Sequence, residues 1–386
     1  MTDKKKIGLY VHYPFCSHKC GYCDFNSWAS KDLRLHTQQW LKMISAELQF
    51  FAEQVGSFYF VDTVFLGGGT PSLMQVGEIK QLKEMIHRYF ELDKNSEITM
   101  EMNPEDITED YISGIKSLQF VNRFSMGVQS FSTRQLKSLE RQANTEQNHK
   151  ALKLIQKHWP HRWSFDLMFS LPEQSTQELV TDLELALAYG PKHISIYELT
   201  LTTNKSKLWK KPSEKEILEH TQLVEDYLLS HQLRQYEISN FSLLGHESRH
   251  NLKYWNLEDY LGIGPGASSL IRMQEDQKLA HHLKRSSRFD LWCSEQDKLS
   301  DVVSSQFELR DARIHLEEVL MMGLRLNDGV SKEKIAQLSS NAGQILSDYK
   351  ALGFLLDDQV SWKTTLRGRR VLEGFLPSLF NRLELK

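Results

Sequence analysis

The sequence predicts an α/β protein, a partial (β/α)6 TIM-like barrel followed by a smaller, mainly helical, winged-helix-like domain. Apolar β-rich runs alternate with amphipathic stretches over residues 7–199, which is typical of a parallel sheet covered by helices. Polar or glycine-rich segments follow successive runs, where the loops of such a barrel converge. Beyond residue 300 the pattern changes to helices and a hairpin, which predicts the second domain.

The elements of the barrel are expected in order along the chain. The expected strands are residues 7–12, 61–66, 97–102, 122–128, 164–168 and 193–199. The expected helices are residues 37–55, 76–89, 107–118, 148–158 and 176–188. A nucleotide-binding glycine fingerprint is absent from the sequence, which favours a barrel.

The second half of the chain is less regular. We expect a helix over 213–231, a short strand over 236–238 and a loop-rich stretch over 240–269. Helices over 311–326 and 342–352 and a hairpin over 353–362 follow. The expected domains are a barrel (1–235), a linking segment (236–300) and the winged-helix-like domain (301–386).

The hairpin side of the last domain is basic. It carries Lys363, Arg367, Arg369 and Arg370. We interpret these side chains as a solvated edge, with a contact surface for a partner or nucleic acid as the alternative.

Composition indicates an ordinary globular protein. The 386 residues are 40% hydrophobic and 25% charged. The net charge of −3 argues against a nucleic-acid function driven by bulk electrostatics. An export signal is not visible, and no apolar run approaches the roughly 18 residues of a spanning helix. We therefore expect a cytoplasmic protein.

Three of the four cysteines are clustered near the start of the chain. Cys16, Cys20 and Cys23 have the spacing C-x3-C-x2-C, while Cys293 lies far away. One short loop with this spacing is able to bind an iron–sulfur cluster. Three thiolates on a four-iron cube leave one iron open for other chemistry. The alternatives are structural zinc, completed by His12 or His18, and free thiols without metal.

The cysteine loop, with an aromatic residue before Cys23, resembles the radical S-adenosylmethionine (SAM) superfamily. The segments GLYVHYPFCSHKCGYCDF, FLGGGTPS, EMNP, FSMGVQSF, DLMFSLP and YEISNFS occur in the order of its coproporphyrinogen-oxidase-like branch. The likeness extends almost over the whole chain, to MMGLRLNDGV near residue 330 and TLRGRR near residue 370.

Two positions separate the subgroups of this branch. Oxygen-independent coproporphyrinogen oxidases have an extra cysteine two residues past the third ligand, where this chain has Phe25. Residues 250–255 read His-Asn-Leu-Lys-Tyr-Trp, similar to the H-N-x-x-Y-W signature of HemW-type haem chaperones. The resemblance implies a protein that binds haem and passes it to haem-requiring apoproteins. The alternatives are a coproporphyrinogen III oxidase and a radical SAM enzyme acting on another substrate.

The resemblance also implies cofactor-binding residues, without assigning a catalytic one. Cys16, Cys20 and Cys23 would bind a [4Fe-4S] cluster, and SAM would bind its open iron. Gly69 and Thr70 would hold the methionine part of SAM, and Tyr22 would contact its adenine. The further expected SAM contacts are Tyr10, Glu101, Gln129, Arg141 and Asp166. His250 is the expected haem ligand.

The partners that the resemblance implies are haem, haem-requiring apoproteins and a cluster reductant. The apoproteins include membrane-associated respiratory enzymes. Nucleic acid is not an expected partner, and a homodimer is an open alternative.

Overall fold

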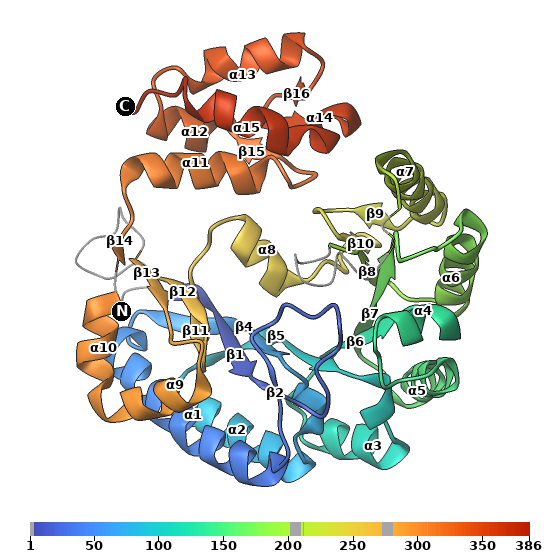
Figure 1. The fold of residues 1–386 in the computed structure, drawn as a ribbon. Helices are drawn as coiled ribbons and strands as arrows, with labels where there is room; N and C mark the ends of the chain where they lie inside the picture. The colour runs from blue at the N-terminus through green and yellow to red at the C-terminus, as the bar shows by residue number, and fades with distance from the viewer. Residues whose placement is uncertain (1–3, 201–209, 211, 272–280, 307) are drawn as a thin grey trace.

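The computed structural model describes residues 4–200, 210, 212–271, 281–306 and 308–386. Six neighbouring parallel strands form the wall of an open barrel, and helices cover its outside (Figure 1). The strands are β1 (Lys5–Tyr13), β4 (Tyr59–Gly68), β5 (Leu92–Met102), β6 (Arg123–Gln129), β7 (Arg162–Phe169) and β8 (His193–Glu198). The six strands and the partial barrel that the sequence predicts are therefore confirmed.

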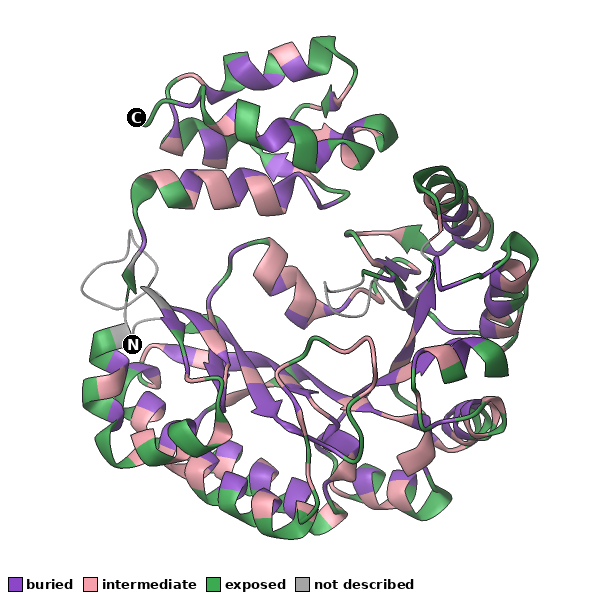
Figure 2. Cartoon of the chain, viewed as in Figure 1, coloured by how far each residue is buried: buried purple, intermediate pink, exposed green. Residues whose placement is uncertain are grey.

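The helices between these strands, and the one after β8, also agree with the prediction. They are α1 (Leu33–Val55), α2 (Val76–Tyr89), α3 (Glu109–Ser117), α5 (Thr145–His158), α6 (Thr176–Ala188) and α7 (Glu214–Ser230). Their buried residues face the sheet and their exposed residues face outwards (Figure 2). This distribution is what the amphipathic pattern dictates.

The sheet is wider than the sequence predicts. β11 (Tyr260–Ile263) pairs in parallel with β1, and three antiparallel strands continue the sheet beyond it. These are β12 (Ser268–Ile271), β13 (His281–Lys284) and β14 (Glu308–Leu309). β10 (Asn240–Ser242) and β9 (Arg234–Gln235) form the other edge. Residues of the expected linking segment, among them Ile263 and Trp292, therefore belong to the barrel core.

The prediction of a strand over 236–238 is wrong. These residues form the bend between the antiparallel strands β9 and β10. The polar Glu237 is buried and the apolar Ile238 is exposed, the reverse of what a strand packed on the core requires. Within the expected loop, residues 249–255 form the short helix α8 (Arg249–Trp255). Seven residues are too few for the 3.6-residue period of a helix to be recognised in the sequence.

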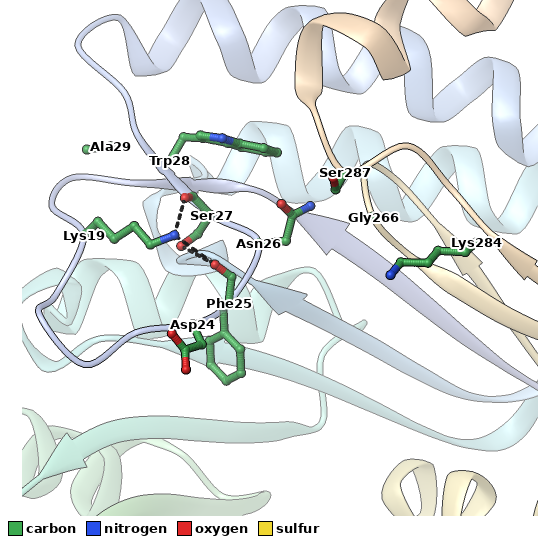
Figure 3. Close-up of a pocket in the computed structure, with 10 residues that line it drawn as sticks. All are labelled: Lys19, Asp24, Phe25, Asn26, Ser27, Trp28, Ala29, Gly266, Lys284 and Ser287. Carbon is green, nitrogen blue, oxygen red and sulfur yellow. Dashed lines mark hydrogen bonds between the residues drawn. The ribbon is translucent and has the colours of Figure 1, made fainter. Parts of the chain in front are cut away.

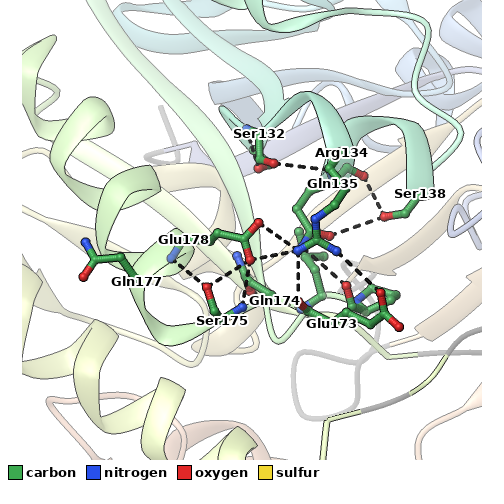
Figure 4. A network of polar contacts seen from close by, with 12 residues as sticks. Ser132, Arg134, Gln135, Ser138, Glu173, Gln174, Ser175, Gln177 and Glu178 are labelled. Carbon is green, nitrogen blue, oxygen red and sulfur yellow. Dashed lines mark hydrogen bonds and ion pairs between the residues drawn. The ribbon is translucent and has the colours of Figure 1, made fainter.

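Caps and ion pairs fix the loops on the side of the barrel where the strands end. Ser175 and Glu178 form a capping box at the start of α6. Arg134 on α4 (Thr133–Ser138) donates to Glu178 at 2.8 Å and to the Glu173 carbonyl at 2.9 Å. Figure 4 shows this network joining the loop after β6 to the loop after β7. The pairing holds α4, and with it the segment that leads to Arg141, against the barrel.

The second domain has its own core. It contains α11 (Ala312–Gly323), α12 (Lys332–Leu338), α13 (Ala342–Ala351), α14 (Leu366–Arg370) and α15 (Leu372–Phe380). β16 (Leu355–Asp357) and β17 (Ser361–Thr364) form the predicted hairpin, and β15 (Val330–Ser331) adds a third strand. The winged-helix-like arrangement is thus present. Among the described residues, none of the helices is both long and apolar enough to cross a bilayer.

Part of the basic edge of this domain faces the barrel. Arg369 Nη1 donates to Gln235 at 2.6 Å, and Arg370 Nη2 lies 3.3 Å from Glu225 on α7. Lys363 instead pairs with Asp358 of the hairpin at 2.9 Å. These side chains therefore connect the two domains or stabilise the hairpin, and do not form one solvated strip.

Candidate functional site

A cavity of about 410 Å³ lies where the barrel strands end. Its wall joins the cysteine loop to the ends of β4, β5, β6 and β7. Ten of the residues expected from the sequence line it: Cys16, Cys20, Tyr22, Cys23, Gly69, Thr70, Glu101, Gln129, Arg141 and Asp166. Segments from residue 16 to residue 166 thus meet in one place, as the carboxyl ends of parallel strands do.

The cysteine loop is closed at its base. β2 (Phe15–Cys16) pairs in parallel with β3 (Trp28–Ala29), so the chain enters and leaves the loop side by side. Lys19 Nζ donates to the carbonyl oxygens of Phe25 at 3.1 Å and Ser27 at 3.0 Å (Figure 3). The amide of Gly21 donates to the carbonyl of Leu139 at 3.2 Å. These hydrogen bonds hold the eleven residues between β2 and β3 in one conformation, although they form no helix or strand.

The thiols of the loop stand in a partly desolvated environment. Burial raises the pKa of Cys16 and of Cys20, and the charge of Arg141 opposes the rise at Cys20. Buried thiolates need positive charge close by, which a bound metal centre supplies. Three cysteines around one opening therefore fit an iron–sulfur cluster.

The zinc alternative needs a histidine as its fourth ligand. The ring of His12 is already occupied by Tyr10 Oη at 2.9 Å and the Asn26 carbonyl at 2.8 Å. His18 lines the cavity together with the three thiols and is the remaining candidate for a fourth zinc ligand.

Arg141 links the cysteine loop to the barrel. Its Nη1 lies 3.7 Å from Cys20 Sγ. Its Nη2 donates to Asn103 Oδ1 at 3.1 Å and to the Gly127 carbonyl at 2.7 Å. Its Nε is buried without a hydrogen-bond partner among the described residues. The guanidinium therefore combines a positive charge next to the thiols with a donor left for an anionic group.

The glycine loop after β4 is shaped by a close approach to the chain after β1. The amides of Gly69 and Thr70 donate to the carbonyls of Tyr13 at 2.7 Å and Phe15 at 2.9 Å. A Cβ on Gly69 would lie 2.6 Å from the Phe15 carbonyl oxygen, closer than any side chain tolerates. Because both amides are used, a ligand here would meet carbonyl oxygens and the Thr70 hydroxyl, which suit an ammonium group.

Two carboxyl groups form the floor of the cavity. Burial and the neighbouring Asp166 raise the pKa of Glu101 to about 7, although Gly68 N donates to it at 3.0 Å. Burial raises the pKa of Asp166 to about 6 against hydrogen bonds from Ser195 and Ser125. A positively charged or hydroxyl-rich ligand would stabilise the ionised form of both carboxyl groups.

Gln129 adopts an unusual backbone conformation at the end of β6. Its φ is +67°, a left-handed value for a residue with a side chain. The pairing of β6 with β7 shifts register between Gly127 and Gln129. The bulge turns Gln129 into the cavity lining, and strain of this kind is concentrated at functional sites.

Tyr10 and His250 lie apart from the cavity lining. Tyr10 stacks on Phe65, and its hydroxyl contacts His12. His250, on α8, is fully buried, with Nδ1 2.9 Å from Thr63 Oγ1 and Nε2 2.8 Å from Tyr254 Oη. Burial lowers the pKa of His250 to about 3. In this conformation neither ring nitrogen of His250 is available to iron.

Some lining residues were not among the expected contacts. Asn103 connects Arg141 to Thr70, whose Oγ1 accepts from Asn103 Nδ2 at 3.2 Å. Ser125 hydrogen-bonds Asp166, and Met168 adds an apolar surface. Asn103 directly follows a predicted strand, so its position at a strand end could have identified it as a lining residue. Ser125 and Met168 lie inside strands and carry no such signal.

Comparison with known proteins shows the family of this chain. Residues 10–186 match the radical SAM superfamily, and residues 311–371 match the HemN C-terminal domain. Heme chaperone HemW of Buchnera aphidicola (Schizaphis graminum) is 31% identical over 96% of this chain and 97% of that protein. The chain belongs to the HemW family. Heme chaperone HemW of Escherichia coli is 30% identical over 97% of this chain and 98% of that protein.

A vertebrate protein and a solved structure are similar over nearly the same length. Radical S-adenosyl methionine domain-containing protein 1, mitochondrial, of Danio rerio is 29% identical over 98% of this chain and 88% of that protein. The structure of coproporphyrinogen III oxidase (HemN) from Escherichia coli superposes with a TM-score of 0.81. It covers 98% of this chain and 91% of that chain at 19% identity, which establishes the shared fold.

Membership of the radical SAM superfamily implies a [4Fe-4S] cluster and SAM. The residues present fit both. The three thiols fit the cluster, and the unpartnered Nε of Arg141 and the raised pKa values of Glu101 and Asp166 fit a zwitterionic, hydroxyl-bearing ligand.

Proposed function

We propose that this protein binds haem and delivers it to haem-requiring apoproteins, while it carries a [4Fe-4S] cluster and SAM in the cavity. The observation that carries the proposal is the full-length similarity to curated proteins named heme chaperone HemW. Phe25 supports it, because the oxidase branch has a further cysteine at this position. Phe25 lies at the cavity opening with 65% of its surface exposed.

In the proposal, Cys16, Cys20 and Cys23 bind the cluster, whose open iron takes the amino and carboxylate groups of SAM. Arg141 supplies positive charge beside the thiolates. Tyr22 contacts the adenine, and Gly69 and Thr70 present oxygens to the methionine part. The remaining SAM contacts are Glu101, Gln129 and Asp166, with Tyr10 behind them as a second layer.

His250 remains the proposed haem ligand, with a conformational condition. Its nitrogens are bonded to Thr63 and Tyr254, so ligation requires α8 to move away from β4 and release one of them. The recipient apoproteins, the cluster reductant and the expected cytoplasmic location are parts of the same proposal. All four cysteines are free thiols, which suits a reducing compartment.

The test is haem transfer under anaerobic conditions. The reconstituted protein, loaded with haem and SAM, is mixed with a haem-depleted apoprotein, and the recovery of that protein's activity and absorption is followed. The proposal predicts transfer faster than from haem bound to serum albumin. Transfer at the albumin rate would contradict it.

The second candidate is a coproporphyrinogen III oxidase, which the structural likeness to HemN favours. Incubation with coproporphyrinogen III, SAM and a reductant distinguishes the two. Formation of protoporphyrinogen would establish the oxidase and reject the chaperone. The variant Phe25→Cys controls for the missing cysteine alone.

A further inference from the structure

A second cavity opens at the opposite end of the barrel, where the strands begin. It measures about 680 Å³, within the range of small-molecule sites. Arg123, Arg162 and His193 stand at the first positions of β6, β7 and β8, and Lys94 lies near the start of β5. It shares none of its lining residues with the cavity of the cysteine loop. The two cavities are therefore separate sites.

The lining of this cavity is strongly basic in a chain whose net charge is −3. Five cationic side chains line it: Lys94, Arg123, Arg162, Lys192 and Arg249. The single carboxylate in the lining, that of Glu97, is already engaged. Its Oε1 accepts from the amide of Arg249 at 2.8 Å, and its Oε2 lies 3.6 Å from Arg162 Nη1. The cavity thus retains an excess of positive charge.

Three of the cations make no ion pair in the described part of the chain. Within the described ranges, no carboxylate oxygen lies within 4.0 Å of a side-chain nitrogen of Lys94, Arg123 or Lys192. Arg123 is 2% exposed, and among the described residues its guanidinium makes one hydrogen bond, to Ser164 Oγ, which is long at 3.4 Å. The charge of Arg123 acts on the buried Asp166 and lowers its pKa, but no ion pair joins the two. A buried guanidinium without a paired counter-charge is costly for a fold. A bound anion would remove that cost.

A histidine adds an unused polar atom. His193 is 3% exposed, and its Nε2 lies 2.8 Å from Tyr236 Oη. Its Nδ1 is buried and has no hydrogen-bond partner in the part of the chain that the structure describes. Burial lowers the pKa of the neighbouring His246, and the charges of Arg162 and Lys192 lower it further. The two histidines and the cations thus line the same cavity.

We propose that this cavity binds a small molecule that carries two or more carboxylate or phosphate groups. The exposed rim lysines, Lys94 and Lys192, neutralise one group, and Arg123 on the floor takes another. Trp163, in the same lining, offers a flat apolar surface to the body of the ligand. Phosphate esters and the two propionates of haem share this chemistry.

The test uses the cluster-loaded full chain and three probes. Inorganic pyrophosphate is titrated by calorimetry, and haemin and haemin dimethyl ester by absorption. Lys94→Gln/Lys192→Gln removes the rim charges without touching the core. Lys80→Gln/Lys215→Gln removes two exposed lysines on α2 and α7 and is the matched control. We expect the rim variant to bind at least one anionic probe with an affinity lower by roughly tenfold or more. The control variant should bind both anionic probes as the wild type does.

The pattern of loss identifies the ligand. Loss of pyrophosphate binding alone indicates a phosphate ester. Loss of haemin binding, together with weak binding of the dimethyl ester, indicates haem propionates. Equal binding of both anionic probes to the rim variant, the control and the wild type would overturn the proposal. Haem delivery by the wild type is measured separately, so failure here leaves the proposed chaperone function intact.

Discussion

The guanidinium of Arg141 lies 3.7 Å from the sulfur of Cys20, 121 residues earlier in the chain. The same guanidinium holds the side chain of Asn103 and the carbonyl of Gly127 at the ends of β5 and β6. One side chain thereby fixes the position of the cysteine loop relative to the barrel. A change at Arg141 should affect both the loop and the cavity.

Replacement of Arg141 by Met should destabilise the metal-free protein. It leaves the oxygens of Asn103 and Gly127 without their donor, which costs about 2–4 kcal/mol in the free energy of unfolding. Arg141→Lys keeps the positive charge but loses the guanidinium that donates in two directions. Its free energy of unfolding should lie between those of the Met variant and the wild type. Urea unfolding under reducing conditions measures this. Arg88→Met, at an exposed site on α2, is the control, and equal stability of both Met variants would contradict the assigned role.

Gly69→Ala should disrupt the cavity. The added Cβ would lie 2.6 Å from the Phe15 carbonyl oxygen, so the glycine loop must shift, at a cost of about 1–3 kcal/mol. SAM binding to the reconstituted protein should weaken at the same time. Gly77→Ala on α2 is the matched control, because nothing lies within 4 Å of its Cβ. There we expect unchanged or higher stability, by up to about 1 kcal/mol. Equal SAM affinity of the two variants would refute the contact.

Glu101 should make the metal-free protein less stable as pH rises. Its pKa in the fold is raised from 4.5 to about 7, so the unfolded chain releases the proton first. The resulting penalty is absent below pH 4.5, grows as the pH rises to 7 and is complete above it, reaching about 3 kcal/mol. Glu101→Gln should remove it. Urea unfolding of both proteins from pH 5 to pH 8 tests this, and parallel pH profiles would show that Glu101 does not titrate as proposed.

His250→Ala should reduce both stability and haem binding. Loss of the ring leaves Thr63 and Tyr254 without partners in a buried site, which costs about 2–4 kcal/mol. Thr63→Val removes only the bond to Nδ1, so it should ease the movement of α8 and speed haem binding. Haem titration and stopped-flow absorption measure the two effects. If the Ala variant binds and transfers haem as the wild type does, His250 is not the ligand.

The barrel was predictable from the sequence because its pattern is local. β-rich runs and amphipathic helices alternate with regular spacing, and α2 and α6 begin and end at the predicted residues. The edges of the sheet were not predictable. β11 pairs with β1 across about 250 residues of sequence, and a four-residue strand carries too little periodicity to show this partner.

The site was predictable where residue type and strand end coincide. The cysteines, Glu101 and Asp166 satisfy that condition and line the cavity. Arg141 lines it too, but it follows α4 and not a strand, so only the resemblance pointed to it. The setting of His250 was not predictable, because its burial and its two hydrogen bonds depend on tertiary packing of α8 against β4. The basic cavity at the other end of the barrel has the same origin, since its cations come from three strands, a loop and a helix and meet only in the fold.

The most direct test is the metal content of the protein after anaerobic reconstitution with iron and sulfide. The wild type should hold about four irons and four sulfides per chain and absorb near ~400 nm, as a [4Fe-4S] protein does. Cys20→Ser should lose the cluster, and Cys293→Ser should retain it. Zinc in place of iron, or a colourless metal-free chain, would contradict the account.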